Sequence, residues 1–407
     1  MKIRLISSSS GSRGGGEFYL HSLAMGLQEL GHDVTTLMSI DSQMDEMAWQ
    51  FEKSSLCVTR WPYKNTYHRK LRSIRAAFAS KDIRACMEAF SQGAPDLVHI
   101  NQQCLEDGLD LVQAASRCQI PAVSTIHVTK TMSELKAIGG WLRDRLAKRV
   151  LKKSHLELVG ISQTAAIGLA QFVNSSPEIT IIEDHQNRSA NRSHNCSVYS
   201  ISNGVSVPTI KSRDQLRSSW GIPDDAIILG SVGRIEKEKN PHFVIALMKN
   251  LPSHVHFVWL GDGREMDAFR NAIQAEGLAS RIHLGGWTSE ASSYLSGFDI
   301  FILPSFYEGL SLALLESMAI GLPSVASDIY GMDDAIVNRE SGYLCALNDE
   351  SDWIPTLIEL INSPKLRIEV GEAARLKHRN EFSLKAMAER TFAVYEDVIR
   401  RHAEKAR

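Results

Sequence analysis

Residues 300–319 have the sequence IFILPSFYEGLSLALLESMA, which is the strongest local signal in the chain. Four apolar residues come first, a short loop with proline and glycine follows, and apolar residues then recur at helical spacing. The order predicts a buried strand, a loop and the start of a helix. Gly309 permits a ligand to approach the backbone closely, and we expect the amides of Leu310 and Ser311 to point from the helix N-terminus at an anion.

Two carboxylates belong to the same segment. Glu308 lies on the expected loop and can accept hydrogen bonds from hydroxyl groups, while Glu316 follows two helical turns later and can reach the same ligand. Carboxylates beside an anion site suit a ligand that is part diphosphate and part polyol. The alternative interpretation is a helix cap with a solvated glutamate and no ligand. This segment alone does not distinguish a ligand site from such a cap.

A second segment, residues 230–241 with the sequence GSVGRIEKEKNP, follows an expected strand and precedes an expected helix. Gly233 begins the loop, Arg234 supplies a planar fork and Lys239 a point charge. Open α/β sheets bind ligands at the carboxyl ends of their strands, where these residues are expected. Taken alone the segment is equally a solvated charge run, but a parallel sheet brings it close to the Glu308 loop.

The rest of the chain alternates between strand and helix patterns. In the first half the expected strands are Lys2–Ser7, Val34–Met38, Leu97–Ile100 and Val123–His127; in the second half they are Ala226–Val232, Val255–Leu260, Ile282–Leu284, Ile300–Leu303 and Ser324–Ala326. Such alternation predicts an α/β fold with parallel sheets that are covered by helices on both faces. A turn-rich linker at 203–208 divides the chain into domains 1–205 and 206–383.

Two further segments stand apart from this alternation. The C-terminal region has two helical periods, and we expect the last helix, about 384–407, to return to the first domain. Residues 183–200 are polar with few apolar positions, and we expect a surface loop or a local insertion there.

Composition excludes several classes of protein. The chain has 407 residues, a net charge of −2, 43% hydrophobic and 23% charged residues, which is typical of a soluble globular protein and argues against a nucleic-acid partner. No run approaches the ~18 apolar residues of a membrane span, and the first residues do not form a signal-peptide core, so we expect a cytoplasmic protein. The six cysteines are dispersed without a C-x-x-C pair, which disfavours a structural zinc site.

Basic charge concentrates in the first half. Residues 53–81 contain eight basic side chains and no acidic one. Tyr67, Leu71, Ile74 and Phe78 are spaced as one apolar stripe of a helix in this region. The helix either packs on the domain core with a solvated basic face, or docks the protein peripherally on anionic lipid headgroups.

The residues at the centre of both segments carry a family resemblance. Glu308 and Glu316 form an E-x7-E motif, and with residues 233–239, 260–263 and 14–17 they resemble retaining glycosyltransferase family 4. His127, Ser162 and residues 203–205 and 321–325 extend the resemblance over nearly the whole chain. It implies a GT-B fold, in which two Rossmann-like domains face each other across a cleft. The first domain would bind the acceptor and the second a nucleotide-sugar donor.

The resemblance also implies roles for individual residues. Arg234 and Lys239 would hold the donor diphosphate, Glu308 the sugar hydroxyls and Glu316 the ribose. Gly233 and the backbone of Gly309, Leu310 and Ser311 would complete the donor site, and His127 with Gly15 and Gly16 would contribute from the acceptor domain. Fixed cations and amides can stabilise the charge on a departing diphosphate without a metal. The chain has no D-x-D motif, and we expect neither a metal nor another cofactor.

We therefore expect a retaining hexosyltransferase that acts on a glycan or lipid-linked acceptor in surface polysaccharide synthesis. A GT-B isomerase or phosphorylase is an alternative, and it differs in whether nucleotide release requires an acceptor. A Rossmann oxidoreductase needs G-x-G-x-x-G, but Gly14 and Gly16 are followed by Tyr19, and Gly261 and Gly263 by Met266. An inactive sugar-binding module is disfavoured by the intact set of charged residues.

Overall fold

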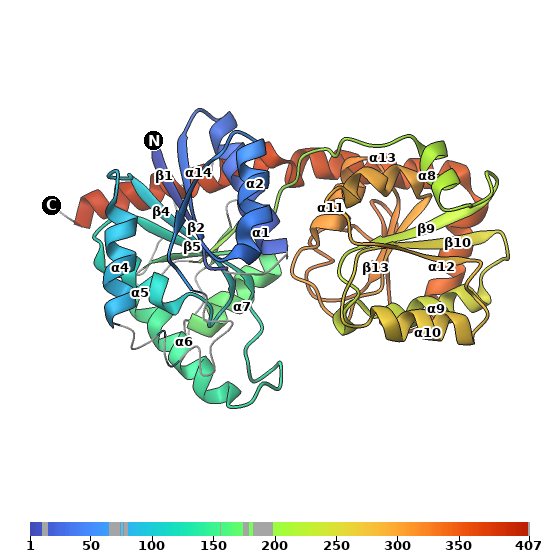
Figure 1. The fold of residues 1–407 in the computed structure, drawn as a ribbon, viewed down its shortest axis with the longest axis horizontal. Helices are drawn as coiled ribbons and strands as arrows, with labels where there is room; N and C mark the ends of the chain where they lie inside the picture. Colours follow the sequence, from blue (N-terminus) through green and yellow to red (C-terminus); the bar gives the residue numbers. More distant parts are fainter. Residues whose placement is uncertain are drawn as a thin grey trace. The chain divides into compact units, whose positions relative to one another are not determined.

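A computed structural model of the chain describes residues 1–9, 15–64, 74, 76, 80–154, 156–173, 179–181 and 198–405. The chain forms two compact units, each of which alternates strands and helices (Figure 1). Unit 1 comprises Met1–Gly204 and Leu384–Arg407, and unit 2 comprises Val205–Ser383. In the described part of the chain each unit contains one parallel sheet, which confirms the predicted α/β fold class.

The sheet of unit 1 has the order β3-β2-β1-β4-β5-β6-β8-β7 among the described residues, and all of its strand pairs are parallel. Its strands are β1 (Lys2–Ser7), β2 (Asp33–Ser39), β3 (Cys57–Trp61), β4 (Leu97–Cys104), β5 (Ala122–Val128), β6 (Glu157–Gly160), β7 (Ile179–Ile181) and β8 (Val198–Ser200). The chain moves outward from β1 to β3 and then returns to β4 on the other side of β1. The direction of winding therefore reverses between β1 and β4.

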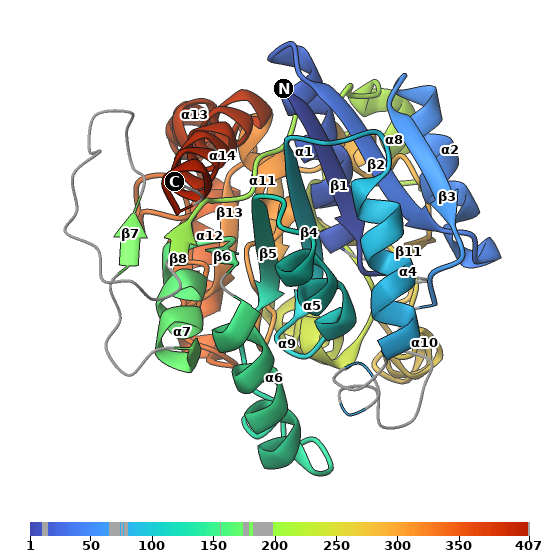
Figure 2. The ribbon, with the colours of Figure 1, turned by 90° about the vertical axis from the view of Figure 1, so that its left-hand side faces the viewer.

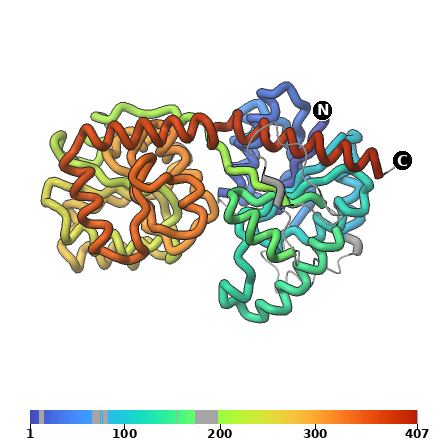
Figure 3. The backbone as a smooth tube through the Cα atoms, turned by 180° about the vertical axis from the view of Figure 1, so that it is seen from behind, coloured from blue at the N-terminus to red at the C-terminus, as the bar shows by residue number. Residues whose placement is uncertain are grey.

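Two separate apolar cores cover the two faces of this sheet. The first contains residues of α1 (Gly15–Glu29), α2 (Asp45–Lys53) and α14 (Leu384–Lys405), and the second contains residues of α4 (Ser80–Ser91), α5 (Leu109–Arg117), α6 (Gly140–Ser154) and α7 (Gln163–Val173). The short helix η1 (Ser42–Met44) precedes α2. The last helix, α14, packs closely on α1, because a Cβ atom at Gly26 would lie 2.7 Å from the Cβ of Ala388 (Figure 3).

The sheet of unit 2 has the order β11-β10-β9-β12-β13-β14 and repeats this winding. Its strands are β9 (Ile227–Val232), β10 (Val255–Leu260), β11 (Ile282–Gly286), β12 (Ile300–Leu303), β13 (Ser324–Ser327) and β14 (Tyr343–Cys345); its helices are α8 (Arg213–Ser219), η3 (Lys237–Lys239), α9 (Pro241–Asn250), α10 (Met266–Ala275), η4 (Ala291–Gly297), α11 (Leu312–Ala319), α12 (Glu350–Asn362), α13 (Pro364–Lys377) and η5 (His378–Phe382). Here the winding reverses between β9 and β12. The residues of the candidate site lie on the loops that follow these two strands.

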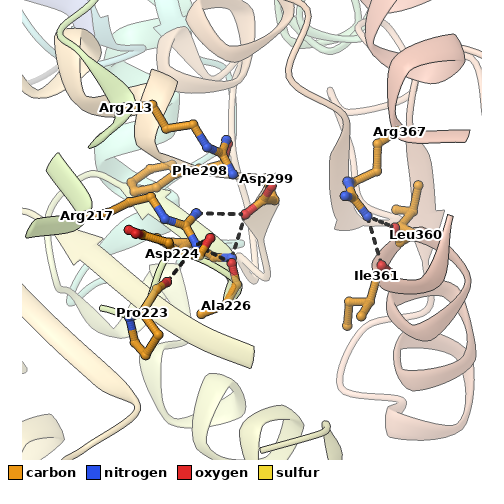
Figure 4. Close-up of polar contacts among 11 residues, drawn as sticks. Arg213, Arg217, Pro223, Asp224, Ala226, Phe298, Asp299, Leu360, Ile361 and Arg367 are labelled. Atoms are coloured by element: carbon orange, nitrogen blue, oxygen red, sulfur yellow. Dashed lines mark hydrogen bonds and ion pairs between the residues drawn. The ribbon is translucent and has the colours of Figure 1, made fainter. Parts of the chain in front are cut away.

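A buried arginine holds α8 against the sheet of unit 2 (Figure 4). Arg217 is 2% exposed, and its guanidinium donates to the carbonyls of Pro223 and Asp224, each at 2.9 Å, and to that of Ala226. It also lies 3.6 Å from the carboxylate of Asp299, which accepts from the amide of Ile228 at 2.8 Å. One side chain thus binds three carbonyls of the turn before β9 and ties α8 to the starts of β9 and β12.

The structure corrects one prediction about residues 183–200. Val198–Ser200 form the buried strand β8 between β6 and β7, so the end of this stretch is part of the sheet and not a surface loop. Residues 183–197 lie outside the described residues, as do Gly14, Tyr67, Leu71 and Phe78. Within the described part of the chain, no helix is long and apolar enough to cross a membrane.

Candidate active site

The loops after β9 and β12 leave the sheet of unit 2 next to each other. The two strands are neighbours at the point where the winding reverses, and the crossover connections from them run to opposite sides. Such a point is where open α/β sheets bind ligands. The amide of Phe306 donates to the carbonyl of Glu238 at 2.8 Å and joins the two loops directly.

Lys239 and Glu308 form an ion pair across these loops. Their side chains are only 17% and 11% exposed, and the hydroxyl of Ser305 donates to the same carboxylate oxygen, Oε1, at 2.6 Å. In the described part of the chain, Oε2 of Glu308 and two of the three N–H groups of Lys239 have no protein partner. The pair therefore retains one acceptor and two donors that a ligand can use.

Arg234 is held more loosely at the end of β9. Its side chain is 57% exposed and contacts Glu238 at 3.3 Å. The backbone before it is tightly fixed, because Gly233 donates to the carbonyl of Leu260 and accepts from the indole of Trp259, both at 2.9 Å. A Cβ atom at Gly261 would lie 1.9 Å from the oxygen of Gly233, so the ends of β9 and β10 approach this closely only with glycine at position 261.

The loop after β12 ends at the N-terminus of α11. Ser311 is the N-cap residue, and its hydroxyl accepts from the amide of Leu314 at 3.5 Å. Leu310 has a buried side chain, so it can contact a ligand only through its backbone. The neighbouring turn packs against Gly309, because a Cβ atom at Gly331 would lie 2.0 Å from the carbonyl oxygen of Gly309. The helix thus begins directly after the segment where the sequence predicts an anion site.

Glu316 lies on α11, and its carboxylate has no partner among the described residues. It is partly exposed, and no described residue forms a hydrogen bond or an ion pair with its carboxylate. Burial raises the pKa of this carboxyl group to about 7, because its surroundings replace water without supplying a compensating donor. Hydroxyl groups of a ligand would supply such donors.

His127 occupies the end of β5 in unit 1 and is neutral. Its Nε2 donates to Oδ1 of Asn101 at 2.7 Å, and Nδ2 of Asn101 donates to the carbonyl of Gly16 at 2.8 Å. Burial lowers the pKa of the imidazole to about 3. Since Nε2 carries the proton in this arrangement, Nδ1 is the acceptor. The ring of Tyr19 from α1 lies nearly perpendicular to the imidazole, with a centroid distance of 4.8 Å.

The glycines at the start of α1 lie near this histidine's partners. Gly16 is buried, and a Cβ atom there would lie 2.2 Å from the side-chain oxygen of Gln103, whereas Gly15 is exposed. The predicted site residues therefore lie in both units, and in unit 2 Lys239 and Glu308 contact each other directly. Three residues that contact the predicted ones or lie beside them in the same loops were not predicted: Asn101, Ser305 and Asn240.

Asn240 links the loop after β9 to the loop after β12 through its side chain. It adopts a left-handed backbone with φ 56°, and its amide donates to the carbonyl of Pro304 at 3.0 Å and to Asn348 at 2.8 Å. An asparagine directly before Pro241 is a recognisable turn signal that could have identified it. No group of three His, Cys, Asp or Glu side chains within the described ranges could hold a metal ion. The absence of a metal requirement stays a prediction.

The fold and the family models together identify the class of protein. Two Rossmann-like units in one chain, with the last helix returned to the first unit, define the GT-B fold class. The model described as "Glycosyltransferase Family 4" matches residues 13–183, and "Glycosyl transferases group 1" matches residues 212–377. The chain belongs to the family 4-like GT-B glycosyltransferases, as the sequence motifs predict.

Individual relatives show how far the likeness extends. The UDP-Gal:alpha-D-GlcNAc-diphosphoundecaprenol alpha-1,3-galactosyltransferase of Escherichia coli is 30% identical over 209 residues, which are 49% of this chain and 54% of that protein. This chain thus spans about half the length of that relative. The D-inositol 3-phosphate glycosyltransferase of Thermobispora bispora is 25% identical over 96% of this chain and 92% of its own length.

The likeness to solved structures supports the fold. The structure of Anabaena HepE in complex with UDP-glucose has a TM-score of 0.76 at 16% identity, and the match covers 98% of this chain and 100% of that one. Sucrose-phosphate synthase from Thermosynechococcus elongatus has a TM-score of 0.77 at 17% identity over the same shares.

Proposed function

We propose that the protein transfers a hexosyl unit from a UDP-sugar to a glycan or lipid-linked acceptor, with retention of the anomeric configuration. The observation that carries this proposal is the Lys239–Glu308 pair at the reversal point of the second sheet, with N–H groups and a carboxylate oxygen left for a ligand. Family membership and the UDP complexes of HepE support the choice of donor.

The chemistry follows from the charges of unit 2. Cleavage of the bond between the anomeric carbon and the diphosphate builds negative charge on the leaving group, which Lys239 and Arg234 stabilise as it develops. Oε2 of Glu308 accepts hydrogen bonds from the hydroxyl groups of the sugar, and the carboxylate of Glu316 accepts hydrogen bonds from those of the ribose. The backbone of Gly233 and of residues 309–311 contacts the phosphates. This arrangement requires neither a metal nor another cofactor.

In unit 1, His127 is proposed to orient the sugar or the acceptor and not to act as an obligate base. Its low pKa keeps the ring neutral at physiological pH, and Asn101 fixes its tautomer. Gly15 and Gly16 would contribute at the start of α1.

We further propose that the protein is cytoplasmic and acts at the membrane in surface polysaccharide synthesis. The names of two relatives support this role: the diphosphoundecaprenol galactosyltransferase already described, and the lipopolysaccharide core glycosyltransferase LpsE of Rhizobium meliloti, which is 27% identical over 42% of this chain.

Thermal unfolding with a panel of UDP-sugars tests donor binding. A donor at about 100 times its dissociation constant stabilises the native state by about 2.7 kcal/mol. That corresponds to an increase of roughly 5–10 °C in the midpoint of a domain the size of unit 2. The Lys239→Ala variant should lose the shift, while the control Lys237→Ala, an exposed lysine in the same turn, should keep it. Equal increases in the thermal midpoint in both variants would show that Lys239 does not bind the donor.

Turnover separates the remaining alternatives. With polyprenyl-diphosphate-linked N-acetylglucosamine as the test acceptor, a transferase releases free UDP only when the acceptor is present. An isomerase or a phosphorylase does not depend on that acceptor, and an inactive binding module shows the thermal shift without release. A thermal response to NAD(H) in place of UDP-sugars would instead favour an oxidoreductase.

A further inference from the structure

An exposed apolar cluster lies at the start of α6 in unit 1. Leu135, Ile138, Trp141 and Leu142, here called the apolar tip, are 37%, 97%, 67% and 39% exposed. Figure 2 shows α6 and the turn before it extending beyond the end of β5. Large apolar side chains gathered at one projecting end of a unit are unusual on a protein surface and indicate contact with another phase or molecule.

The turn that presents the apolar tip is held in place by specific contacts. The carboxylate of Asp144 accepts from the amides of Met132 at 2.7 Å and Ser133 at 3.0 Å, and Glu134 accepts from the amide of Thr131 at 2.6 Å. Arg143 forms a two-pronged ion pair with the buried Glu106. The apolar tip is therefore exposed by a fixed backbone and does not depend on a chance loop conformation.

The remainder of the exposed surface of α6 is basic. Its exposed residues after the apolar tip are Arg145, Lys148, Arg149, Lys152 and Lys153, here called the basic face. Among the described residues none of the five forms an ion pair. Asp144 is the one acidic residue of the helix, and its carboxylate is engaged by the turn. The opposite side of α6 packs into the core through Ala147 and Leu151.

We propose that α6 and its preceding turn dock unit 1 on an anionic phospholipid bilayer. The basic face binds the headgroups, and Ile138, Trp141 and their neighbours enter the boundary between headgroups and acyl chains. A helix with an apolar end and a lysine- and arginine-rich face is typical of interfacial helices, and tryptophan favours that boundary. This surface differs from the stripe expected at Tyr67–Phe78, which the structure leaves largely undescribed.

Charge and shape favour a bilayer over other partners. A second copy of the chain in a two-fold contact would place the five cations opposite the same five cations. A nucleic acid would attract the basic face, but it would leave the aliphatic side chains of the apolar tip in water. An anionic bilayer accommodates both. The inference rests on the proposed function only for its biological purpose, because binding to lipid is measured without sugar transfer.

Co-sedimentation of the full chain with vesicles tests the proposal. Vesicles of phosphatidylcholine alone are compared with an equal mixture of phosphatidylcholine and phosphatidylglycerol, at about 0.1 M and about 1 M salt, where the screening length falls from about 10 Å to about 3 Å. We expect binding to the anionic vesicles that weakens strongly with salt. Absence of binding, or equal binding to both vesicles, would overturn the proposal.

Matched variants locate the binding surface. Neutralising Lys148 and Lys152 to glutamine should weaken binding about 25-fold, at about fivefold for each charge. The control neutralises Arg375 and Arg379, which have the same spacing and exposure in unit 2, and should leave binding unchanged. Equal binding by both double variants would overturn the assignment to α6.

The apolar tip is tested in the same way. Ile138→Ser with Trp141→Ser should abolish the binding that persists at high salt, while the exposed Ile368→Ser on α13 should not. Unchanged thermal midpoints would show that each variant is folded. A change in self-association or in DNA binding without any change in vesicle binding would assign the surface to another partner. Loss of donor protection would count against the proposed transfer reaction alone, so the two proposals fail separately.

Discussion

Removal of the Lys239 ammonium is the most informative single change at the ends of β9 and β12. In the Lys239→Ala variant, Glu308 keeps the hydroxyl of Ser305 but loses its cation. Breaking a buried ion pair costs about 3–5 kcal/mol, and breaking an exposed one about 0–1 kcal/mol. Because the two side chains are 17% and 11% exposed and one donor remains, we expect a stability loss of about 2 kcal/mol.

Lys239→Ala should also lower the rate of sugar transfer, and by more than the small decrease in the folded fraction would explain. Loss of one preorganised donor to a developing oxyanion lowers turnover about 10²–10³-fold. Lys237→Ala is the matched control, because the side chain of Lys237 is exposed in the same turn and has no partner among the described residues. It should retain both stability and turnover. Chemical denaturation measures stability, and UDP release at saturating donor measures turnover.

A double-mutant cycle separates the two roles of the lysine. Lys239→Ala combined with Glu308→Gln should be less destabilised than the sum of the single variants, because the coupling of contacting residues is about 0.5–3 kcal/mol. Turnover should nevertheless fall in every variant that lacks Lys239. Additive stability effects would refute the ion pair, and near-normal turnover in Lys239→Ala would refute its role in bond cleavage.

Three further predictions concern Glu316, Arg217 and Asn101. The folded-state pKa of Glu316 is raised from 4.5 to about 7, so the native state binds more protons than the unfolded state between these pH values. The free energy of unfolding should therefore fall as the pH rises from 4.5 to about 7, and donor affinity should rise through pH 7 as the carboxylate forms. Neither effect should appear when Glu316→Gln is measured over the same pH range. Arg217→Met should lower the free energy of unfolding, measured with denaturant, by about 3 kcal/mol, because it leaves buried acceptors without a donor. Arg213→Met is the control: its side chain is 43% exposed, and its loss should lower the free energy of unfolding by less than about 1 kcal/mol. Asn101→Ala should lower the stability of the native state in thermal unfolding by about 2 kcal/mol, because it removes the hydrogen bonds to His127 and Gly16. The increase in thermal midpoint on addition of a UDP-sugar should be unchanged, because these contacts lie in unit 1.

The second half of the chain was largely predictable because its local signals are strong. The strands Val255–Leu260 and Ile300–Leu303 have the predicted bounds, since each is a short, mostly apolar run that is followed directly by glycine or proline. The parallel sheet then accounts for the meeting of Lys239 and Glu308, which are 69 residues apart. Two loops that follow neighbouring parallel strands must emerge on the same edge.

Short strands and long-range polar contacts were not predictable. The strands β8 and β14 have three residues each, too few for a periodic pattern, and tertiary pairing defines them. Asn101 bridges His127 and Gly16 across separations of 26 and 85 residues, which no local spacing encodes. The roles assigned to individual site residues also stay predictions, because they came from the family resemblance.

The surface of α6 was missed although its charge is present in the sequence. The five residues of the basic face lie within residues 145–156, which contain no acidic residue. No local pattern shows the turn before α6, where the carboxylates of Glu134 and Asp144 accept backbone amides. That turn exposes Ile138 and Trp141 at the start of the basic helix, and this combination becomes visible only in the structure.

The anomeric configuration of the first product shows whether the protein is a retaining transferase. Proton NMR of a reaction with UDP-sugar, the polyprenyl-diphosphate-linked acceptor and a metal chelator follows the new glycosidic linkage and the released UDP together. We predict an anomeric signal of the same configuration as the donor, growing in step with UDP and unaffected by the chelator. A product of inverted configuration, or UDP release that does not require the acceptor, would contradict the proposed retaining transfer.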